Sequence, residues 1–169
     1  VRKVIECCIK YNVKTLTIYA FSTENWKRPI KEVEGLLELF SNSISKESKK
    51  IHANKIKLKF IGDISIFTEP LQLKIKEIEK ETFRNKRLML NVALNYGGRL
   101  DIVNSVNTFY NNKKKIKKIT EKNINSGLYT KGQSDVDLLI RTGGQQRMSN
   151  FLLWQSAYAE LFFSKKLWP

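Results

Sequence analysis

Residues 87–103 read "RLMLNVALNYGGRLDIV" and pass from an apolar strand through a glycine turn into a helix. The strand is mostly apolar, which is typical of a strand that is buried on both faces of a sheet. Apolar side chains then recur at helical spacing at Ile102, Val106 and Phe109. A buried strand followed directly by a helix predicts a parallel sheet that is covered by helices.

The alternation of strand and helix extends in both directions from this stretch. Helical spacing marks residues 1–12, 30–53, 71–78 and 121–126, and strand patterns mark residues 13–20, 55–63 and 135–140. In the strand at 55–63 lysines alternate with apolar residues, which places it near a sheet edge. We also predict an apolar helix over residues 151–161, with Ser149 or Asn150 as its N-cap. The chain is therefore expected to form a single α/β domain with a mainly parallel central sheet flanked by helices.

The composition is that of a basic globular protein. The chain has 169 residues, with 31 Lys and Arg against 16 Asp and Glu, so its formal net charge is +15. This charge favours an anionic partner, which includes nucleic acid, a lipid surface and a phosphorylated substrate. The basic run at residues 111–118 is expected to be a solvated segment. No apolar run approaches the roughly 20 residues that a membrane-spanning helix requires.

The cysteines, the histidine and the chain ends indicate the cellular compartment, the kind of metal site and the extent of the protein. Cys7 and Cys8 are adjacent on a predicted helix and cannot form an ordinary disulfide, which favours a reducing compartment. His52 is the single histidine, so a zinc site built on histidines is excluded. The chain opens at Val1 without a signal-peptide pattern and ends without a polar tail. Both ends indicate an excerpt from a longer protein.

Three loops follow predicted strands at their carboxyl ends, where parallel α/β sheets bind their ligands. These loops cover residues 21–29, 96–99 and 141–150, and each contains arginine. In the third loop Arg141 and Arg147 flank two glycines, and Ser149 follows. Guanidinium groups, a glycine turn and a hydroxyl suit a diphosphate. The alternative is a glycine turn in which the arginines cap carbonyl groups or pair with nearby aspartates.

Two further residues stand out by their surroundings. Glu160 is isolated in the apolar run "AYAELFF", and a buried acid is costly unless it is paired or bound to a metal. Magnesium held by this carboxylate and substrate phosphates is one interpretation. A salt bridge to an arginine is the other. Trp26 is compatible with a lid over a substrate and equally with a packed loop residue.

Three long stretches together resemble the cis-prenyltransferases, the undecaprenyl or dehydrodolichyl diphosphate synthase family. They are "LTIYAFSTENWKRP" (16–29), "LNVALNYGGRLDIV" (90–103) and "DLLIRTGGQQRMSNFLLWQSAYAELFFSKKLWP" (137–169). The resemblance implies a prenyltransferase that adds isopentenyl diphosphate to an allylic diphosphate such as farnesyl diphosphate. The new double bonds are cis, the product is a long-chain polyprenyl diphosphate, and Mg²⁺ is the cofactor.

The resemblance also implies roles for individual residues. Arg141, Arg147 and Ser149 match the residues that hold isopentenyl diphosphate, and Glu160 matches the acid that helps to hold Mg²⁺. The mobile catalytic loop is matched by Asn25, Trp26 and Arg28. Leu88, Leu90 and Val92 match the strand that lines an apolar product tunnel in this family. These residues fit a protein core equally well.

The chain departs from the family pattern in three places. The first strand and the Asp-Gly-Asn-Gly-Arg loop, which binds the allylic diphosphate and supplies the catalytic aspartate, have no match, nor has the last helix. We therefore predict one cis-prenyltransferase domain over 1–169 that is incomplete at both ends, so that the fragment itself lacks half of the active site. Gln145 and Gln146 stand where bacterial members have Glu-His.

Three functional hypotheses follow. The leading one is cis-prenyl chain elongation by a homodimer that uses the segment "SAYAELFFSKKLWP" at its interface, without nucleic acid. We expect it in the cytoplasm, in peripheral contact with membrane lipid through its product, at the endoplasmic reticulum in a eukaryote. The second is a non-catalytic subunit of a cis-prenyltransferase complex, suggested by the missing aspartate loop. The third, a nucleic-acid-binding α/β domain, rests only on charge.

Overall fold

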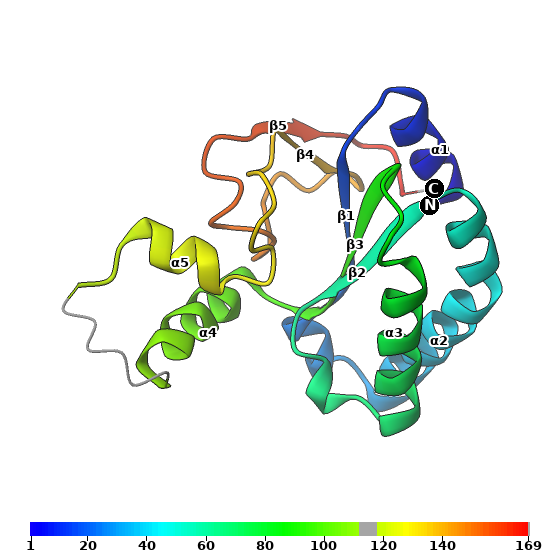
Figure 1. Cartoon of the computed structure of the whole chain (residues 1–169), viewed down its shortest axis with the longest axis horizontal. Coiled ribbons are helices and arrows are strands. Elements are labelled where there is room, and N and C mark those ends of the chain that lie inside the picture. Colours follow the sequence, from blue (N-terminus) through cyan, green and yellow to red (C-terminus); the bar gives the residue numbers. More distant parts are fainter. Residues whose placement is uncertain (112–117, 169) are drawn as a thin grey trace. The chain divides into compact units, whose positions relative to one another are not determined.

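The computed structural model describes residues 1–111 and 118–168, without the side chains of residues 45, 48 and 49 (Figure 1). The helices are α1 (Arg2–Lys10), α2 (Ile30–Ala53), α3 (Glu69–Thr82), α4 (Gly98–Asn111) and α5 (Glu121–Gly127). The strands are β1 (Thr15–Ser22), β2 (Ile56–Ile61), β3 (Leu88–Tyr96), β4 (Leu138–Arg141) and β5 (Glu160–Phe163). Two 3₁₀ helices, η1 (Thr23–Lys27) and η2 (Ile64–Ile66), complete this order. Most of the basic run predicted to be solvated, residues 112–117, lies outside the described residues.

The chain divides into two compact units, residues 1–95 and 96–169. Within the described part of the first unit, β1, β3 and β2 form a three-stranded sheet in that order. β2 and β3 are parallel, and their register runs from Ile56 opposite Leu88 to Ile61 opposite Ala93. Helices α2 and α3 contact each other and β2. The core of this unit is formed by the apolar side chains between these helices and the sheet.

Side chains of α3 protect the outer edge of β2. The Thr82 hydroxyl accepts a hydrogen bond from Leu58 N at 3.1 Å, and Glu79 Oε1 accepts one from Phe60 N at 2.6 Å. Burial raises the pKa of Glu79 above its ordinary value, although this backbone hydrogen bond opposes the shift. The bonds satisfy N–H groups that would otherwise form an open edge. The predicted edge position of β2 is therefore confirmed.

The described part of the second unit contains a sheet of two parallel strands, β4 and β5. Its register runs from Leu138 opposite Glu160 to Arg141 opposite Phe163. Helices α4 and α5 pack against each other. Their contact is close at Gly127, where a Cβ would lie 2.3 Å from the Ser105 hydroxyl oxygen. A side chain at position 127 would therefore push the two helices apart.

The helix predicted over residues 151–161 is wrong. The chain forms turns over residues 151–158 and then enters β5. Ser149, Asn150 and Leu152 have φ angles of 49°, 63° and 45°, so the backbone is left-handed where a helix would have to start. Neither predicted N-cap therefore caps a helix here. The end of the apolar run pairs with β4 instead, beginning with a hydrogen bond from Glu160 N to Asp137 O at 2.9 Å.

The α/β class with parallel sheets and flanking helices is confirmed, whereas the single domain stays a prediction because each unit is described by itself. The other predicted helices and strands are present, and the strand at 88–96 is buried along nearly its whole length, as expected. Among the described residues, no helix combines the length and apolar character needed to cross a membrane.

Candidate functional site

The predicted anion site begins where β4 ends. Arg141, its last residue, donates from Nη1 to the Ser149 hydroxyl oxygen at 2.5 Å and to the backbone carbonyl of Arg147. Neither arginine forms an ion pair with a carboxylate within the part of the chain that the structure describes. Arg141 is half-buried, and Arg147 and Ser149 are exposed. The Arg141 guanidinium therefore lies beside a hydroxyl without a described carboxylate partner, an arrangement that is suited to an anion.

The contacts of Arg141 include the carbonyl capping that the alternative interpretation predicted. One Nη1 hydrogen-bonds a carbonyl, as the alternative interpretation predicted, and the same group holds Ser149. A guanidinium has five N–H donors, so these bonds fix its position and leave other donors for a ligand. The expected pairing with nearby aspartates is not seen among the described residues.

The two glycines shape the turn without exposing their N–H groups to a ligand. Gly143 and Gly144 have φ angles of 85° and 77°, which favour glycine. Gly143 N donates to Lys166 O at 2.8 Å, and Gly144 N donates to Ser164 O at 2.9 Å. The turn is therefore anchored to the segment that follows β5. Side chains, rather than these backbone groups, are the available donors of the site.

A second predicted loop lies against this one within the second unit. Helix α4 begins at Gly98, whose N–H donates to Asn150 O at 2.7 Å, and Arg99 N donates to Asn150 Oδ1 at 2.9 Å. The Arg99 side chain is exposed. The structure thus joins two of the three predicted loops. The third, residues 21–29, belongs to the first unit and is described separately.

Asp101 connects four segments of the second unit. It is 1% exposed and accepts hydrogen bonds from Tyr96 OH at 2.9 Å, Tyr129 N at 3.0 Å and Gln155 Nε2 at 3.2 Å. Gln155 Nε2 also donates to the Thr130 hydroxyl at 2.9 Å. A buried carboxylate that accepts several hydrogen bonds fixes the groups around it. Asp101 is therefore a structural anchor rather than an accessible reactive group.

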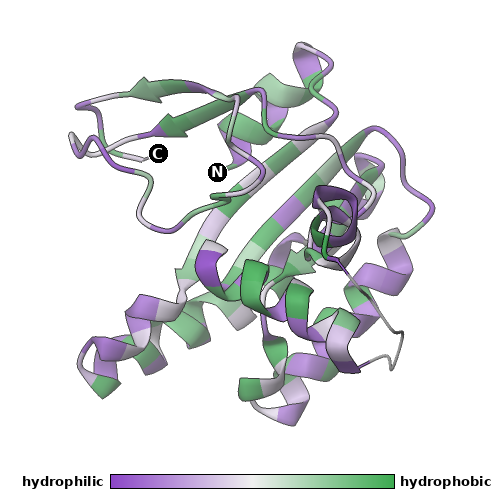
Figure 2. Ribbon diagram, turned by 90° about the vertical axis from the view of Figure 1, so that its left-hand side faces the viewer, coloured by the Kyte–Doolittle hydropathy of each residue, from purple (hydrophilic) through white to green (hydrophobic). Residues whose placement is uncertain are grey.

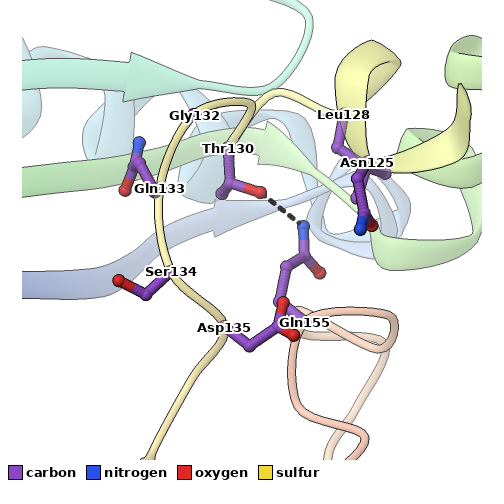
Figure 3. A pocket seen from close by; sticks show the side chains of 8 residues that line it. All are labelled: Asn125, Leu128, Thr130, Gly132, Gln133, Ser134, Asp135 and Gln155. Atoms are coloured by element: carbon purple, nitrogen blue, oxygen red, sulfur yellow. Dashed lines mark hydrogen bonds between the residues drawn. The ribbon is translucent and has the colours of Figure 1, made fainter. Parts of the chain in front are cut away.

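A pocket of about 260 Å³ lies beside Gln155 (Figure 3). Its lining consists of Asn125, Leu128, Thr130, Gly132, Gln133, Ser134, Asp135 and Gln155. None of these residues is basic, and Asp135 adds a negative charge. The pocket is therefore a poor site for a diphosphate, which leaves the region around Arg141 as the better candidate.

The loop at residues 21–29 holds its predicted catalytic residues by internal contacts. Asn25 Oδ1 accepts a hydrogen bond from Ser22 N at 2.8 Å in a capping box of η1. Trp26 is 37% exposed, packs edge-on against Phe21 and donates from Nε1 to Asn95 Oδ1 at 2.8 Å. These contacts agree with a packed loop residue, and a lid over a substrate stays a prediction.

Arg28 ends the same loop in a surface ion pair. Its Nη1 lies 2.5 Å from Glu32 Oε1, and both side chains are about half exposed. Such a pair contributes roughly 0–1 kcal/mol, so a competing anion can displace it at little cost. The arrangement keeps a guanidinium group at the loop without burying it.

The predicted tunnel residues belong to the core of the first unit. Leu88, Leu90 and Val92 are 1%, 3% and 6% exposed. They share one face of β3. Leu37 and Phe40 of α2 pack against the same core cluster. This face is an apolar wall of the kind an isoprenoid chain requires. Whether it opens into a tunnel stays a prediction.

Glu160 is exposed at the first position of β5, not buried in a helix. The burial argument for this acid is therefore wrong, and no salt bridge to it is seen among the described residues. No cluster of three His, Cys, Asp or Glu residues suited to a metal occurs in the described ranges. Mg²⁺ commonly uses one or two carboxylates together with phosphates and waters. An accessible Glu160 fits such a ligand.

The sequence did not reveal the contacts of Asn95 and Asn150 with the predicted loops. Asn95 receives the Trp26 N–H and has a φ of 48°; Asn150 caps α4 and has a φ of 63°. Asparagine is enriched at positive φ, so an Asn next to a strand end or a glycine turn was the available signal. Their partners lie far away in the sequence, which no local pattern indicates.

The comparison with known proteins gives one family over the whole chain. The family model described as putative undecaprenyl diphosphate synthase matches residues 1–169. A ditrans,polycis-undecaprenyl-diphosphate synthase ((2E,6E)-farnesyl-diphosphate specific) of Pasteurella multocida is 49% identical over 173 aligned residues, which cover 100% of this chain and 72% of the relative. A protein of the same description from Haemophilus influenzae is 48% identical with the same coverage.

Two solved structures share the fold. A probable undecaprenyl diphosphate synthase from Campylobacter jejuni has a TM-score of 0.92 and 36% identity, covering 99% of this chain and 80% of that one. Lavandulyl diphosphate synthase from Lavandula x intermedia, in complex with dimethylallyl diphosphate, has a TM-score of 0.91 and 32% identity. This match covers 97% of this chain and 73% of that chain.

Proposed function

This chain belongs to the undecaprenyl diphosphate synthase family, and on that premise we propose that it elongates cis-prenyl chains by adding isopentenyl diphosphate to farnesyl diphosphate. In each step a carbon–carbon bond forms, diphosphate leaves the allylic substrate with its electron pair, and a proton is lost as the new double bond forms. The relatives named as farnesyl-diphosphate specific support the choice of allylic substrate.

The residue assignment rests on the contacts of the Arg141 guanidinium. Arg141 is held by Ser149 and by the Arg147 carbonyl, and no described carboxylate neutralises either guanidinium. Charge-assisted hydrogen bonds from arginine match the oxygens of a diphosphate. We assign Arg141, Arg147 and Ser149 to the diphosphate of isopentenyl diphosphate. Binding here would hold that substrate in place while its double bond attacks.

Arg141→Ala in the full-length protein is expected to raise KM and Kd for isopentenyl diphosphate about 10- to 100-fold, because one or two charge-assisted hydrogen bonds are lost. Steady-state kinetics and calorimetry measure the two constants. Arg84→Ala, which removes an exposed arginine from the first unit, serves as the matched control and should leave both unchanged. Equal constants for Arg141→Ala and the unsubstituted protein would reject the assignment.

The remaining roles extend the same proposal. Glu160 would help to hold Mg²⁺ together with the substrate diphosphates, and the ion would neutralise charge on the departing diphosphate. Asn25, Trp26 and Arg28 are assigned to the catalytic loop at the end of β1. The same assay tests both points, because Glu160→Gln should raise the Mg²⁺ concentration needed for half-maximal rate, and Asn25→Ala should lower kcat.

The tunnel proposal rests on the apolar wall of β3. Leu88, Leu90 and Val92 all face the buried side of the first unit. Their assignment to the path of the growing chain is read out by the length of the products, which should change in Leu90→Ala. An unchanged distribution of product lengths in that variant would mean that these residues only form the core and do not line the tunnel.

We further propose that the protein is a homodimer. One face of the β4–β5 sheet carries Leu138, Ile140 and Phe162, which are 53%, 58% and 58% exposed, and both strands are coloured largely hydrophobic in Figure 2. An exposed apolar face of this kind is typical of a protein interface. Phe162→Glu is expected to convert a dimer to a monomer in sedimentation at micromolar concentration. A protein that sediments as a monomer without substitution contradicts the proposal.

The product gives the proposed location. A long polyprenyl chain belongs in a bilayer, so the protein is assigned to the cytoplasm with peripheral contact to membrane lipid. Its net charge of +15 favours a surface of anionic lipids. Cosedimentation with anionic vesicles, which should weaken as salt is raised, measures this contact.

A further inference from the structure

Helix α4 lacks a capping side chain of its own and receives one from a distant residue. It begins in the pair Gly97–Gly98, and the first N–H groups of a helix have no partner within it. Asn150 supplies two of the missing acceptors: its backbone carbonyl accepts from Gly98 N at 2.7 Å and its Oδ1 accepts from Arg99 N at 2.9 Å. The cap of α4 therefore comes from the turn that carries Ser149.

The contact leaves little freedom for the two partners to shift. A Cβ at position 98 would lie 2.8 Å from Leu153 Cγ and 3.2 Å from Asn150 O. Asn150 itself has a φ of 63° and its neighbour Ser149 a φ of 49°, so the turn is held in a left-handed conformation that few residues adopt. The position of the Ser149 side chain is thus set by the contact of Asn150 with α4.

The Ser149 side chain in turn holds the guanidinium group of Arg141. Its hydroxyl oxygen accepts from Arg141 Nη1 at 2.5 Å. Two hydrogen bonds, from Arg99 N to Asn150 Oδ1 and from Arg141 Nη1 to the Ser149 hydroxyl, are thus linked by the peptide bond between Ser149 and Asn150, all within the second unit. A diphosphate site requires donors at fixed separations, because its oxygens are bound at defined distances and angles.

We propose that Asn150 is a positioning residue, which acts through Ser149 to hold Arg141 in the geometry that binds the diphosphate of isopentenyl diphosphate. The inference rests on the proposed function, since it assigns a role within that site. Asn150 touches neither substrate nor metal in this role. Its effect on binding depends on the Ser149 hydroxyl, and this dependence separates it from a residue that only stabilises the fold.

A double-mutant cycle tests the dependence. Asn150→Gly keeps the backbone conformation and removes the Oδ1 cap, and Ser149→Ala removes the link to Arg141. In the full-length protein, Asn150→Gly is expected to raise Kd for isopentenyl diphosphate about fivefold, with Kd for the allylic substrate unchanged. In the Ser149→Ala background the same substitution should change Kd less than twofold. Equal fold-changes in the two backgrounds overturn the proposal.

Two further variants keep the outcome interpretable. Thr120→Ala removes the cap of α5 in the same unit, and it should lower thermal stability without changing Kd. If Asn150→Gly behaves like Thr120→Ala, Asn150 is a structural cap only and the proposal is wrong. Asn150→Asp retains the acceptor and adds a charge, so it should change Kd by the same factor with Ser149 and with Ala at position 149. A factor that differs between the two backgrounds contradicts the proposal. This test remains usable if Asn150→Gly does not fold.

Arg141→Ala distinguishes this inference from the function on which it rests. An unchanged Kd in Arg141→Ala removes the diphosphate site itself, and with it any role for Asn150. A raised Kd in Arg141→Ala with no effect of Asn150→Gly leaves the site in place and overturns only the positioning role. The two failures therefore give different results in one set of binding measurements.

Discussion

Gly62→Ala is expected to lower the free energy of unfolding by about 3–5 kcal/mol, a large part of the 5–15 kcal/mol of a typical domain. Gly62 follows β2 with a φ of 121°, a conformation that side chains rarely adopt. A Cβ there would lie 2.1 Å from Leu94 O and 3.0 Å from Asn95 O. Both atoms belong to the backbone of β3 or its end, so no side chain can rotate away to relieve the contact.

Urea unfolding of the variant and of Gly132→Ala separates the two causes of this loss. Gly132 has a φ of 78° but nothing lies within 4 Å of a Cβ added there, so its substitution carries backbone strain without a clash. We expect about 1 kcal/mol for Gly132→Ala. Losses of equal size in the two variants would show that the contact with β3 does not matter.

Gly62→Ala should also change the position of the loop that contains Trp26. Asn95 accepts the Trp26 N–H and donates from Nδ2 to Asp63 O at 2.8 Å, immediately after Gly62. Displacement of the Asn95 backbone therefore moves the acceptor that holds Trp26. Under conditions in which the variant is still folded, we expect a lower kcat and a shift of tryptophan fluorescence.

Local patterns predicted the first unit well because its elements are long and strongly periodic. The lysines at 57 and 59 alternate with Leu58 and Phe60, so one face of β2 had to be buried and the other solvated. The stretch from Leu88 to Leu94, which is apolar except at Asn91, likewise predicted a strand covered on both faces. Neither prediction required knowledge of distant partners.

The second unit was predicted less well, for a physical reason. Residues 151–161 are apolar at spacings that suit a helix, but the left-handed turn at Ser149 and Asn150 and the pairing of Glu160 with β4 determine their conformation. Those are long-range hydrogen bonds, which compete with local propensity and here outweigh it. The three loops do follow strands, as predicted, whereas the contacts that Asn95 and Asn150 make with them were not predicted.

Asp101→Ala is expected to destabilise the protein by about 3–5 kcal/mol, because it removes a buried acceptor that three donors share. Tyr96 OH, Tyr129 N and Gln155 Nε2 all donate to this carboxylate, which is 1% exposed. Each donor has given up water to make its bond, and loss of the carboxylate removes the hydrogen bond that compensates for this. Thermal and urea unfolding measure the loss.

Asp135→Ala is the matched control, since Asp135 is an exposed aspartate of the same unit and should change stability by less than about 0.5 kcal/mol. Tyr96→Phe tests whether this hydrogen bond carries part of the loss, because the variant lacks the hydroxyl that donates to Asp101. Its cost should be clearly smaller in the Asp101→Ala background than in the unsubstituted protein. Strictly additive losses would mean that Tyr96 and Asp101 stabilise the unit independently, and the anchoring role of the carboxylate would then be wrong.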